Sequence, residues 1–552
     1  MRKKAKVLVM VMVVLVAMSI TASQALAVAP KVGVVCLQHV GAASGSGALA
    51  ECAVAMARMF EYAGCDVYMI DSGDIVDNNI LSTIDLIAFP GGYGVAYKSY
   101  FAPNTGDSVR NALRDFISDG GAFVGICAGA YFAADICAWE GRDFEYYLDL
   151  FMGDAVGSIT DISDYSEVEP MKITPVRMVD SDFSWNNDTY NIGYLWGPYF
   201  SGYNGGDLPE GIDVVGVYDY EVNGEPGEAD EEAAMIKFEF GNGRVFLSGV
   251  HPEYEESSTL SNSRDWCFGD DYDNSSGNAV ADPDTEYDIM ADIIGWLCPG
   301  KTISKGLSSP HNTTAAVYGT CGAATRTVWA TMKMLRSCGI EPYSYTGCAA
   351  DEITIDKFDI AVFPNGKETV MDNYIDESTL DTFLADGGHF MGFGGGAKII
   401  GVQLNYWGGG QDLSPPAQHG MEDVTIVDND TGSGTYEIAY WKEDSADHHW
   451  DGLSPTNPTY YTPISWTSAQ VDDTPNAVEV GYFADEGSSQ ICMVKYPWGD
   501  GGSKIFLSTV DPSTHEGSNS TDGCQWDDGT HGYSDSDSEW GLIDNILFWM
   551  GL

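Results

Sequence analysis

The sequence predicts an α/β protein with two tandem domains, each a doubly wound, flavodoxin-like parallel sheet. The chain of 552 residues is too long for one ordinary domain. Short apolar runs without polar alternation alternate with helical segments, as in a parallel sheet covered on both faces. Finally, several sequence blocks occur twice in the same order. In such sheets the functional site lies at the carboxyl ends of the strands.

The first half shows the alternation most clearly. Residues 32–37 and 86–89 are buried-strand runs, and residues 49–62 between them have helical spacing that ends near Gly64. A further helix runs through Ile117, and residues 122–126 form the next strand. The resulting order βαβαβ predicts the doubly wound sheet.

Self-comparison indicates an internal duplication. The paired blocks are 85–92 with 359–366, 119–130 with 386–397, 189–194 with 435–440, and 245–253 with 505–513. Each half closes with an amphipathic helix, around residues 293–297 and 543–550. We expect domains at 28–300 and 315–552, joined by a linker at 301–314 that is rich in Ser, Thr and Gly.

The first 27 residues have the features of a signal peptide. A positive start is followed by an apolar run at 7–20 and by the small-x-small pattern Ala25-Leu26-Ala27. The run is shorter than the roughly 20 residues that span a bilayer, although an uncleaved anchor is the alternative. We therefore expect a secreted or cell-surface protein whose mature chain has no membrane span.

The chain is strongly acidic, with 26 Lys and Arg against 82 Asp and Glu and a net charge of −56. Such a surface repels nucleic acid and anionic membranes. The acidic residues form a solvated coat or, alternatively, bind Ca²⁺, although their spacing is not that of an EF-hand. The two densest clusters are Asp270, Asp271, Asp273 and Asn274, and Asp535, Asp537 and Glu539.

The 12 cysteines all follow the predicted signal peptide, and export permits disulfides. The sequence does not assign their pairing. Cys127 is open to capture by Cys36 or Cys137. Asn-x-Ser/Thr sequons, possible glycan sites, begin at Asn187, Asn274, Asn312, Asn429 and Asn519.

Cys127 lies in a G-x-C-x-G pattern at residues 125–129. This is the cysteine form of the nucleophile elbow, in which a sharp turn between strand and helix exposes the nucleophile. The helix N-terminus favours the reactive thiolate. The alternative is a buried structural cysteine in a Gly-rich strand end.

Gly91 and Gly92 follow the preceding strand. Their backbone N–H groups, with that of Ala128, are candidates for an oxyanion hole. An ordinary glycine turn is the alternative.

His251 and Glu253 lie at the end of a later strand. In extended backbone, residues i and i+2 face the same side. Glu253 is therefore expected to orient His251, and His251 to take a proton from Cys127. The alternative is a surface loop with incidental polar residues.

The second copy lacks this set. Gly394 stands at the nucleophile position, Asp511 and Ser513 replace the His and Glu, and Asn365 replaces the first glycine of the turn. We expect a scaffold, a dimer-like partner of the first copy, or a ligand-binding domain. His515 and Glu516 follow closely, but no nucleophile remains for them to activate.

Aromatic residues crowd the segment that precedes the late strand in each copy. They form either a carbohydrate- or peptide-binding wall or, as aromatic clusters more often do, packing of an inserted subdomain. They are Trp185, Tyr190, Tyr194, Trp196, Tyr199 and Phe200 in the first copy, and Tyr436, Tyr440, Trp441, Trp450, Tyr460 and Tyr461 in the second.

G-x-C-x-G, an upstream Pro-Gly-Gly and a late His-Pro-Glu resemble class I glutamine amidotransferase-like domains. Residues 89–92 and 121–131 look most like the N-terminal domain of biotin-protein ligases, and residues 315–323 resemble that domain's first strand and loop. The resemblance implies Cys127 as nucleophile, His251 as base and Glu253 as its partner. It does not extend to biotin ligation, because neither a ligase domain nor a biotin-adenylate loop is found. The synthetase domain that a glutamine amidotransferase supplies with ammonia is also missing.

Two functions follow from these observations. One is an exported cysteine amidase or hydrolase acting on a small amide or peptide, without cofactor or metal. The other is a non-enzymatic surface module that binds a partner through an amidotransferase-like cleft. The sequence does not identify the substrate or the oligomeric state.

Overall fold

The computed structural model covers the full chain and describes most of it. Described are residues 28–36, 48–70, 74–75, 80–94, 97–98, 108–145, 148–163, 171–222, 224–254, 286–306, 311–320, 322–366, 371, 377–398, 411–412, 419–428, 434–441, 464–465, 476–483, 491–499, 502–513 and 539–552. The predicted signal peptide, the acidic run 270–274, Asp535 and Asp537, three of the sequons, and His515 and Glu516 lie outside these ranges.

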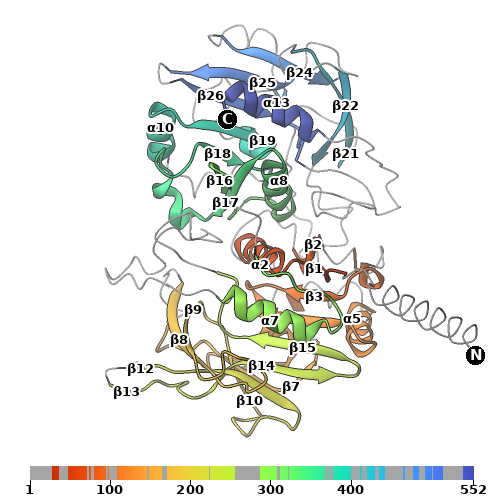
Figure 1. Ribbon diagram of the computed structural model, residues 1–552, viewed down its shortest axis with the longest axis vertical. Coiled ribbons are helices and arrows are strands. Elements are labelled where there is room, and N and C mark those ends of the chain that lie inside the picture. The colour runs from red at the N-terminus through yellow and green to blue at the C-terminus, as the bar shows by residue number, and fades with distance from the viewer. Residues whose placement is uncertain are drawn as a thin grey trace, which may run out of the picture.

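The first domain is built around a parallel sheet (Figure 1). Its strands are β1 (Lys31–Val35), β2 (Asp66–Ile70), β3 (Leu86–Phe89), β4 (Ala122–Ile126), β5 (Ala134–Trp139), β6 (Arg142–Glu145), β7 (Phe151–Gly157), β8 (Lys172–Met178), β9 (Thr189–Tyr194), β10 (Tyr199–Ser201), β11 (Ile212–Tyr218), β12 (Glu221–Val222), β13 (Glu225–Pro226), β14 (Ala233–Phe240) and β15 (Gly243–Ser248). Its helices are α2 (Ala50–Tyr62), the 3₁₀ turn η1 (Ile80–Ser82), α5 (Ser108–Ser118), α6 (Ala128–Ala133) and α7 (Tyr287–Leu297).

Five strands form the parallel core in the order β2-β1-β3-β4-β15. The sheet then continues through β14, which pairs antiparallel with β15. The prediction of a parallel sheet is therefore right for the core, and the antiparallel extension is an addition that the apolar runs did not reveal. The order places the end of β4 beside the end of β15, with Ile126 opposite Ser248.

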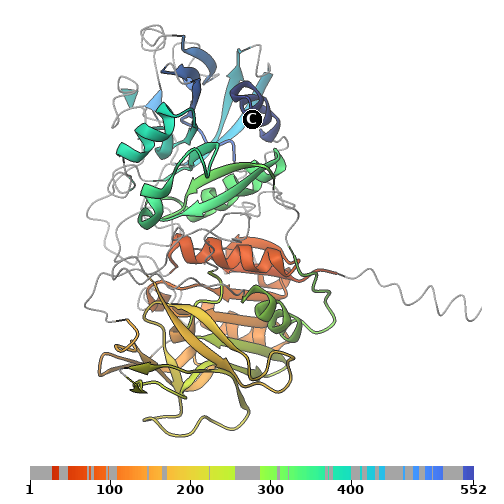
Figure 2. The same cartoon turned by 60° about the vertical axis from the view of Figure 1, so that its left-hand side comes forward.

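The two faces of the parallel core bury alternate residues. Along β3, Leu86 and Ala88 belong to one hydrophobic cluster, and Ile87 and Phe89 belong to the other. The first cluster includes the inner sides of α2 and α7, and the second includes α5. The sheet is thus covered by helices on both faces (Figure 2), which explains its unbroken apolar strands.

The second domain repeats the pattern with fewer described elements. Its strands are β16 (Thr313–Tyr318), β17 (Ile340–Tyr345), β18 (Ile360–Phe363), β19 (His389–Phe393), β20 (Gln411–Asp412), β21 (His419–Ile426), β22 (Gly434–Trp441), β23 (Ile464–Ser465), β24 (Val478–Phe483), β25 (Ile491–Trp498) and β26 (Ser503–Ser508). Its helices are α8 (Thr325–Ser337), the 3₁₀ turn η2 (Gly347–Glu352), α10 (Glu377–Ala385), α11 (Gly395–Lys398) and α13 (Trp540–Met550).

The second sheet has the order β17-β16-β18-β19-β26-β25, which corresponds strand for strand to β2-β1-β3-β4-β15-β14. A buried lysine recurs at the same place in both domains. Lys237 on β14 pairs with Asp180 at 2.6 Å, and Lys495 on β25 pairs with Asp428 at the same distance. This common plan is what an internal duplication would produce.

The two domains meet along α2 and α8 (Figures 1 and 2). Buried residues of both helices belong to one continuous hydrophobic cluster, including Val54 and Val328. The described start of the predicted linker, residues 301–306, packs on the end of α2, where Ser304 N–H donates to the Ala63 carbonyl at 3.1 Å. Strand β16 begins at Thr313, so the last two residues of that linker are already part of the second sheet.

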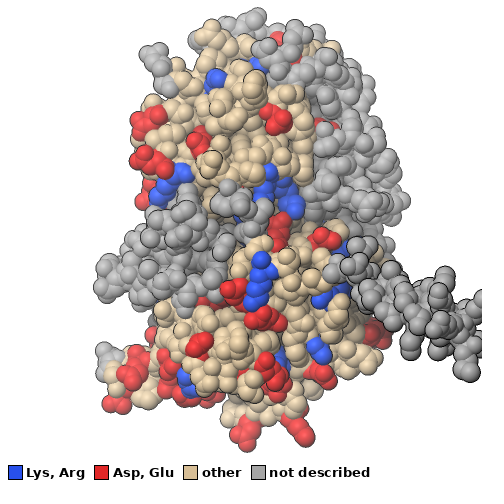
Figure 3. All heavy atoms as spheres, viewed as in Figure 1, with Lys and Arg blue, Asp and Glu red and all other residues tan. Residues whose placement is uncertain are grey.

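Acidic side chains are scattered over the described part of the face in Figure 3, and basic ones gather mainly near the junction of the domains. Within the described residues, no helix is long and apolar enough to cross a membrane.

Candidate functional site

Cys127 occupies the sharp turn between β4 and α6. Its φ of 51° and ψ of −107° lie outside the regions that side-chain-bearing residues favour. Its N–H donates to the Ser248 carbonyl at 2.8 Å, which ties the turn to the end of β15. The strained backbone at this position agrees with the nucleophile elbow predicted from the sequence.

The two glycines of the elbow motif are required by space. A Cβ on Gly129 would lie 2.0 Å from the Phe89 carbonyl oxygen, and one on Gly125 would lie 2.7 Å from the Gly129 carbonyl oxygen. Real Cβ atoms do not approach so closely, so both positions exclude any other residue without a backbone shift. The G-x-C-x-G pattern is therefore a packing requirement of the turn.

His251 is held beside the elbow by its own backbone. It follows β15, and its N–H donates to the Gly193 carbonyl at 2.7 Å, forming an isolated bridge with β9. Pro252 and Glu253 form a turn and are not extended, so the expected extended backbone is wrong. The turn nevertheless brings the Glu253 carboxylate back to the His251 ring.

The two side chains form a buried pair. His251 Nδ1 lies 2.8 Å from Glu253 Oε1, and the side chains are 1% and 0% exposed. Burial alone would lower the pKa of His251, but attraction to Glu253 and to Cys127 raises it to about 10. The site thus favours an imidazolium held between a carboxylate and the Cys127 sulfur. His251 Nε2 has no regular hydrogen-bond partner among the described residues.

The end of β9 also covers the cysteine. Cys127 Sγ lies 3.4 Å from the Leu195 carbonyl oxygen, and Tyr131 O–H donates to the Trp196 carbonyl at 3.1 Å. Of the aromatic set predicted here, Trp185, Tyr194 and Phe200 are buried, and the other three are half-buried. All of this set except Trp196 belong to the core clusters or pack against them. The described residues of its second-domain counterpart lie on β22, and their side chains are not described.

Cys52 joins the site although no sequence motif marked it. It lies in the first turn of α2 and accepts a hydrogen bond from Tyr254 O–H at 3.0 Å. Burial above all, then the charges of Glu51 and Glu253, raise the pKa of Cys52 well above its ordinary value. A neutral thiol results, so Cys52 is a poor nucleophile. The only sequence feature that could have indicated it is its position in the first turn of the helix that follows the loop after β1.

Gly91 makes room for this group. A Cβ there would lie 2.7 Å from His251 Cε1 and 2.9 Å from Cys52 Sγ. The Gly91 carbonyl accepts a hydrogen bond from Leu49 N–H at 3.1 Å, which holds the start of α2 against the turn. Gly92 has a φ of 146°, a conformation that favours glycine.

The second domain shows where the N–H groups of this turn and elbow point. Asn365 Oδ1 accepts hydrogen bonds from Gly366 N–H at 2.8 Å and from Gly395 N–H at 3.0 Å. These donors correspond to Gly92 and Ala128 of the first domain. One oxygen atom reaches both donors, so the backbone of this fold converges its N–H groups on a single point.

The rest of this place in the second domain has the same backbone arrangement as the first domain, but a side chain fills the space of the site. Gly394 keeps a positive φ of 48°, and its N–H donates to Ser508 at 2.8 Å as Cys127 does to Ser248. A Cβ on Gly394 would lie 2.1 Å from Asn365 Oδ1, so the asparagine occupies the space that a cysteine side chain would need. Asp511 accepts hydrogen bonds from both the N–H and the O–H of Ser513. The described residues at this place include neither a thiol nor an imidazole.

Cys127 is a free thiol, as are Cys52, Cys65, Cys298 and Cys338. A cavity of about 580 Å³ opens elsewhere, at the amino ends of β3 and β4. Its lining includes Asp85, Gly121 and Lys301, so it lies at the opposite end of the strands from Cys127.

The strand order, the elbow and the late His–Glu pair define a domain of the class I glutamine amidotransferase-like kind. Residues 35–286, somewhat less than half of the chain, match the family described as biotin-protein ligase, N terminal.

A biotin–protein ligase of Schizosaccharomyces pombe is 27% identical over 192 residues, which cover 33% of this chain and 27% of the ligase. The chain therefore matches only about a quarter of that relative's length. Among solved structures, a putative GMP synthase protein of Thermoplasma acidophilum is 13% identical with a TM-score of 0.27, covering 44% of this chain and 95% of its own. PurLQS of Thermotoga maritima is 14% identical, also with a TM-score of 0.27, covering 43% and 99%.

Proposed function

We propose that the first domain is a cysteine-dependent amide hydrolase, with Cys127 as nucleophile, His251 as general acid and base, and Glu253 as the residue that orients the imidazole. The observation that carries the proposal is the buried 2.8 Å contact between His251 Nδ1 and Glu253, at a site where Cys127 contributes to the raised pKa of His251. A His fixed by a carboxylate beside a cysteine is the arrangement that activates a thiol nucleophile.

These groups and one water molecule are sufficient for amide hydrolysis. The Cys127 thiolate attacks the amide carbonyl carbon, and the developing oxyanion is held by the N–H groups of Gly92 and Ala128. The C–N bond then breaks, and His251 gives its proton to the leaving amine. Water, deprotonated by His251, hydrolyses the thioester to a carboxylic acid and restores the thiol.

The second domain supports the position of this oxyanion hole. Asn365 Oδ1 accepts hydrogen bonds from the two N–H groups that correspond to Gly92 and Ala128, as a substrate oxygen would in the first domain. The role of Gly91 is then to keep the turn free of a side chain, because any Cβ there would press on His251. We propose that the second domain acts as a scaffold with a closed site.

We further propose that the protein is exported through its N-terminal signal peptide and acts on a small amide or peptide outside the cytoplasm. The acidic surface favours neutral or cationic substrates over anionic ones.

The test is turnover of a panel of amino-acid and short-peptide amides by the full chain, with intact-mass detection of a thioester adduct. Cys127→Ser should abolish both, and Glu253→Gln should lower turnover about 100-fold or more. Cys298→Ala, which removes a buried cysteine at the end of α7, should change neither. If Cys127→Ser turns over as the wild type does, the enzyme proposal is wrong and a binding module remains.

A further inference from the structure

Three potential metal ligands of different chemistry meet in the first domain. One ligand atom from each of Cys52, His251 and Glu253 lies within 4.8 Å of the other two, and all three residues are buried. Cys52 comes from α2 and the other two from the turn after β15, so the fold, and not sequence proximity, assembles the group.

The group has a ligand atom to spare. Glu253 Oε2 is buried and has no hydrogen-bond partner among the described residues. Buried polar atoms are normally satisfied, and a bound ion would satisfy this oxygen. Tyr254 O–H donates to Cys52 Sγ at 3.0 Å, which is the kind of outer contact that orients a metal-bound sulfur.

We propose that Cys52, His251 and Glu253 form a zinc site, which goes beyond the hydrolase function. Thiolate, imidazole and carboxylate together suit Zn²⁺, and three protein ligands leave its fourth position for water. In a tetrahedral site with normal bond lengths the ligand atoms lie roughly 3.3–3.7 Å apart. Nδ1 and Oε1 are now 2.8 Å apart and all three ligand atoms lie within 4.8 Å of one another, so small side-chain rotations bring them to this geometry.

Zinc binding competes with the proposed catalysis. Nδ1 of His251 is the nitrogen that faces both Glu253 Oε1, at 2.8 Å, and the space at Gly91 that Cys52 Sγ borders. A Zn²⁺ ion at this corner replaces the proton between Nδ1 and the carboxylate. The imidazole then no longer has a proton on Nδ1 that Glu253 holds. It can therefore no longer act as acid and base toward Cys127.

The test is zinc binding by the metal-free full chain, measured by competition with a chromogenic zinc chelator and by metal analysis after gel filtration. The wild type should bind one Zn²⁺ per chain. Cys52→Ala and Cys52→Ser should each weaken binding about 100-fold, the scale expected when a coordinating contact is lost.

The matched control is Cys65→Ala, because Cys65 is also buried and lies just after the end of the same helix. This variant should bind zinc as the wild type does, and Cys127→Ser should as well, because Cys127 is not among the three ligands. The result for Cys127→Ser separates this proposal from the hydrolase, since that variant loses catalysis but keeps zinc. Equal zinc affinity in wild type and both Cys52 variants, or no zinc bound by the wild type, would overturn the proposal.

Discussion

At the scale of single residues, the backbone of Cys127 is the least ordinary feature of the molecule. Its φ of 51° is a conformation that glycine adopts freely, and Gly394 occupies the corresponding position with a φ of 48°. The first domain therefore keeps a side chain where the fold itself would favour none. Such strain costs on the order of 1–3 kcal/mol and is typical of functional positions.

Replacing Cys127 with Gly and with Ala separates strain from packing. Both variants lose the sulfur, but only Gly relieves the backbone. We expect Cys127→Gly to be more stable than Cys127→Ala by about 1 kcal/mol, although glycine usually destabilises through the entropy of the unfolded chain. Chemical denaturation measures the difference, and an alanine variant as stable as the glycine variant would show that the turn is not strained.

Gly91→Ala tests how tightly the site is packed. The new Cβ would lie 2.7 Å from His251 Cε1, so the ring must move and stability should fall by about 1–3 kcal/mol. Turnover should fall with it, because the imidazole loses its alignment. Gly295→Ala on α7 is the control, since its Cβ would lie 3.5 Å from its nearest neighbour, an ordinary contact. Normal turnover in Gly91→Ala would mean that His251 does not act there.

At the scale of elements, the ends of β4 and β15 and the start of α2 create the site. The sequence allowed the first two to be predicted, because G-x-C-x-G and His-Pro-Glu are local patterns at strand ends. Cys52 escaped prediction because its contact with His251 depends on how α2 packs beside the turn at Gly91. The turn at residues 252–253 was also missed, since period-two reasoning applies only to extended backbone.

The corresponding turn of the second domain has a pH-dependent stability. Burial raises the pKa of Asp511 from 3.8 to about 6, against the hydrogen bonds from Ser513 that lower it. Between these values the folded protein binds more protons than the unfolded chain. The free energy of unfolding should therefore fall by about 3 kcal/mol as pH rises through this window and then level off.

Asp511→Asn should remove this slope, because the amide does not titrate. Thermal unfolding of both proteins between pH 4 and pH 7 makes the comparison, with values read relative to each protein at the acidic end. A slope of equal size in the variant would assign the pH dependence to other groups.

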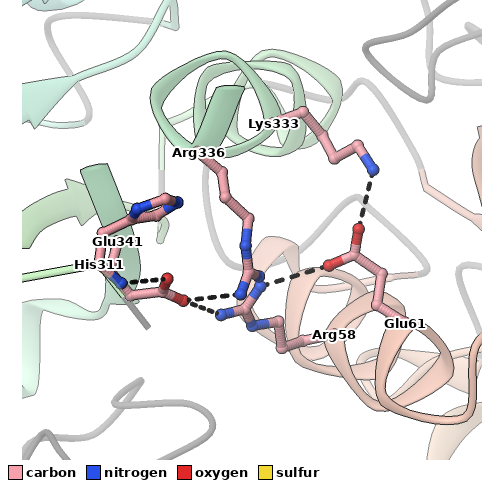
Figure 4. A network of polar contacts seen from close by, with 6 residues as sticks. All are labelled: Arg58, Glu61, His311, Lys333, Arg336 and Glu341. Atoms are coloured by element: carbon pink, nitrogen blue, oxygen red, sulfur yellow. Dashed lines mark hydrogen bonds and ion pairs between the residues drawn. The ribbon is translucent and has the colours of Figure 1, made fainter. Parts of the chain in front are cut away.

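At the scale of the whole molecule, the two domains are joined by buried charges as well as by apolar surface. Arg58 on α2 contacts Glu341 on β17 at 2.5 Å, and Arg336 on α8 contacts the same carboxylate at 3.2 Å (Figure 4). Lys333 and Glu61 add a pair at 2.9 Å across the same boundary. The helix that carries Cys52 is therefore held by the second domain.

Glu341→Gln should break this junction. The substitution removes the carboxylate shared by the buried Arg58 and the half-buried Arg336, and leaves Arg58 with Glu61 at 3.3 Å. Losing a charge partner of a buried ion costs about 3 kcal/mol. Glu231→Gln is the matched control, because Glu231 pairs with Arg177 on the surface and is 64% exposed. That variant should change the free energy of unfolding by less than about 0.5 kcal/mol. If the two substitutions changed the free energy of unfolding equally, the interdomain ion pairs would contribute no more to stability than a surface pair.

The presence of two sheet domains was predictable from the sequence because three of the four repeated blocks contain a strand and the turn after it, where packing restricts residue choice most. The contact between α2 and α8 could not be predicted from the sequence. The charged residues of these helices look like those of an ordinary solvated face, because their partners are not apparent from the sequence. Asn365 was seen only as a replacement for glycine. Its role as an acceptor for two backbone N–H groups follows from the turn geometry alone.

The central claim is that Cys127, His251 and Glu253 act as one unit, and the most direct measurement is the rate at which iodoacetamide alkylates Cys127 in the native full chain, read by peptide mass. We predict selective labelling of Cys127 at neutral pH, slowed about tenfold or more by His251→Ala, since the sulfur loses the imidazole that would activate it. His311→Ala, in the predicted linker, should leave the rate unchanged. Labelling of Cys127 that is unaffected by His251→Ala, or no labelling of Cys127 at all, would contradict the account.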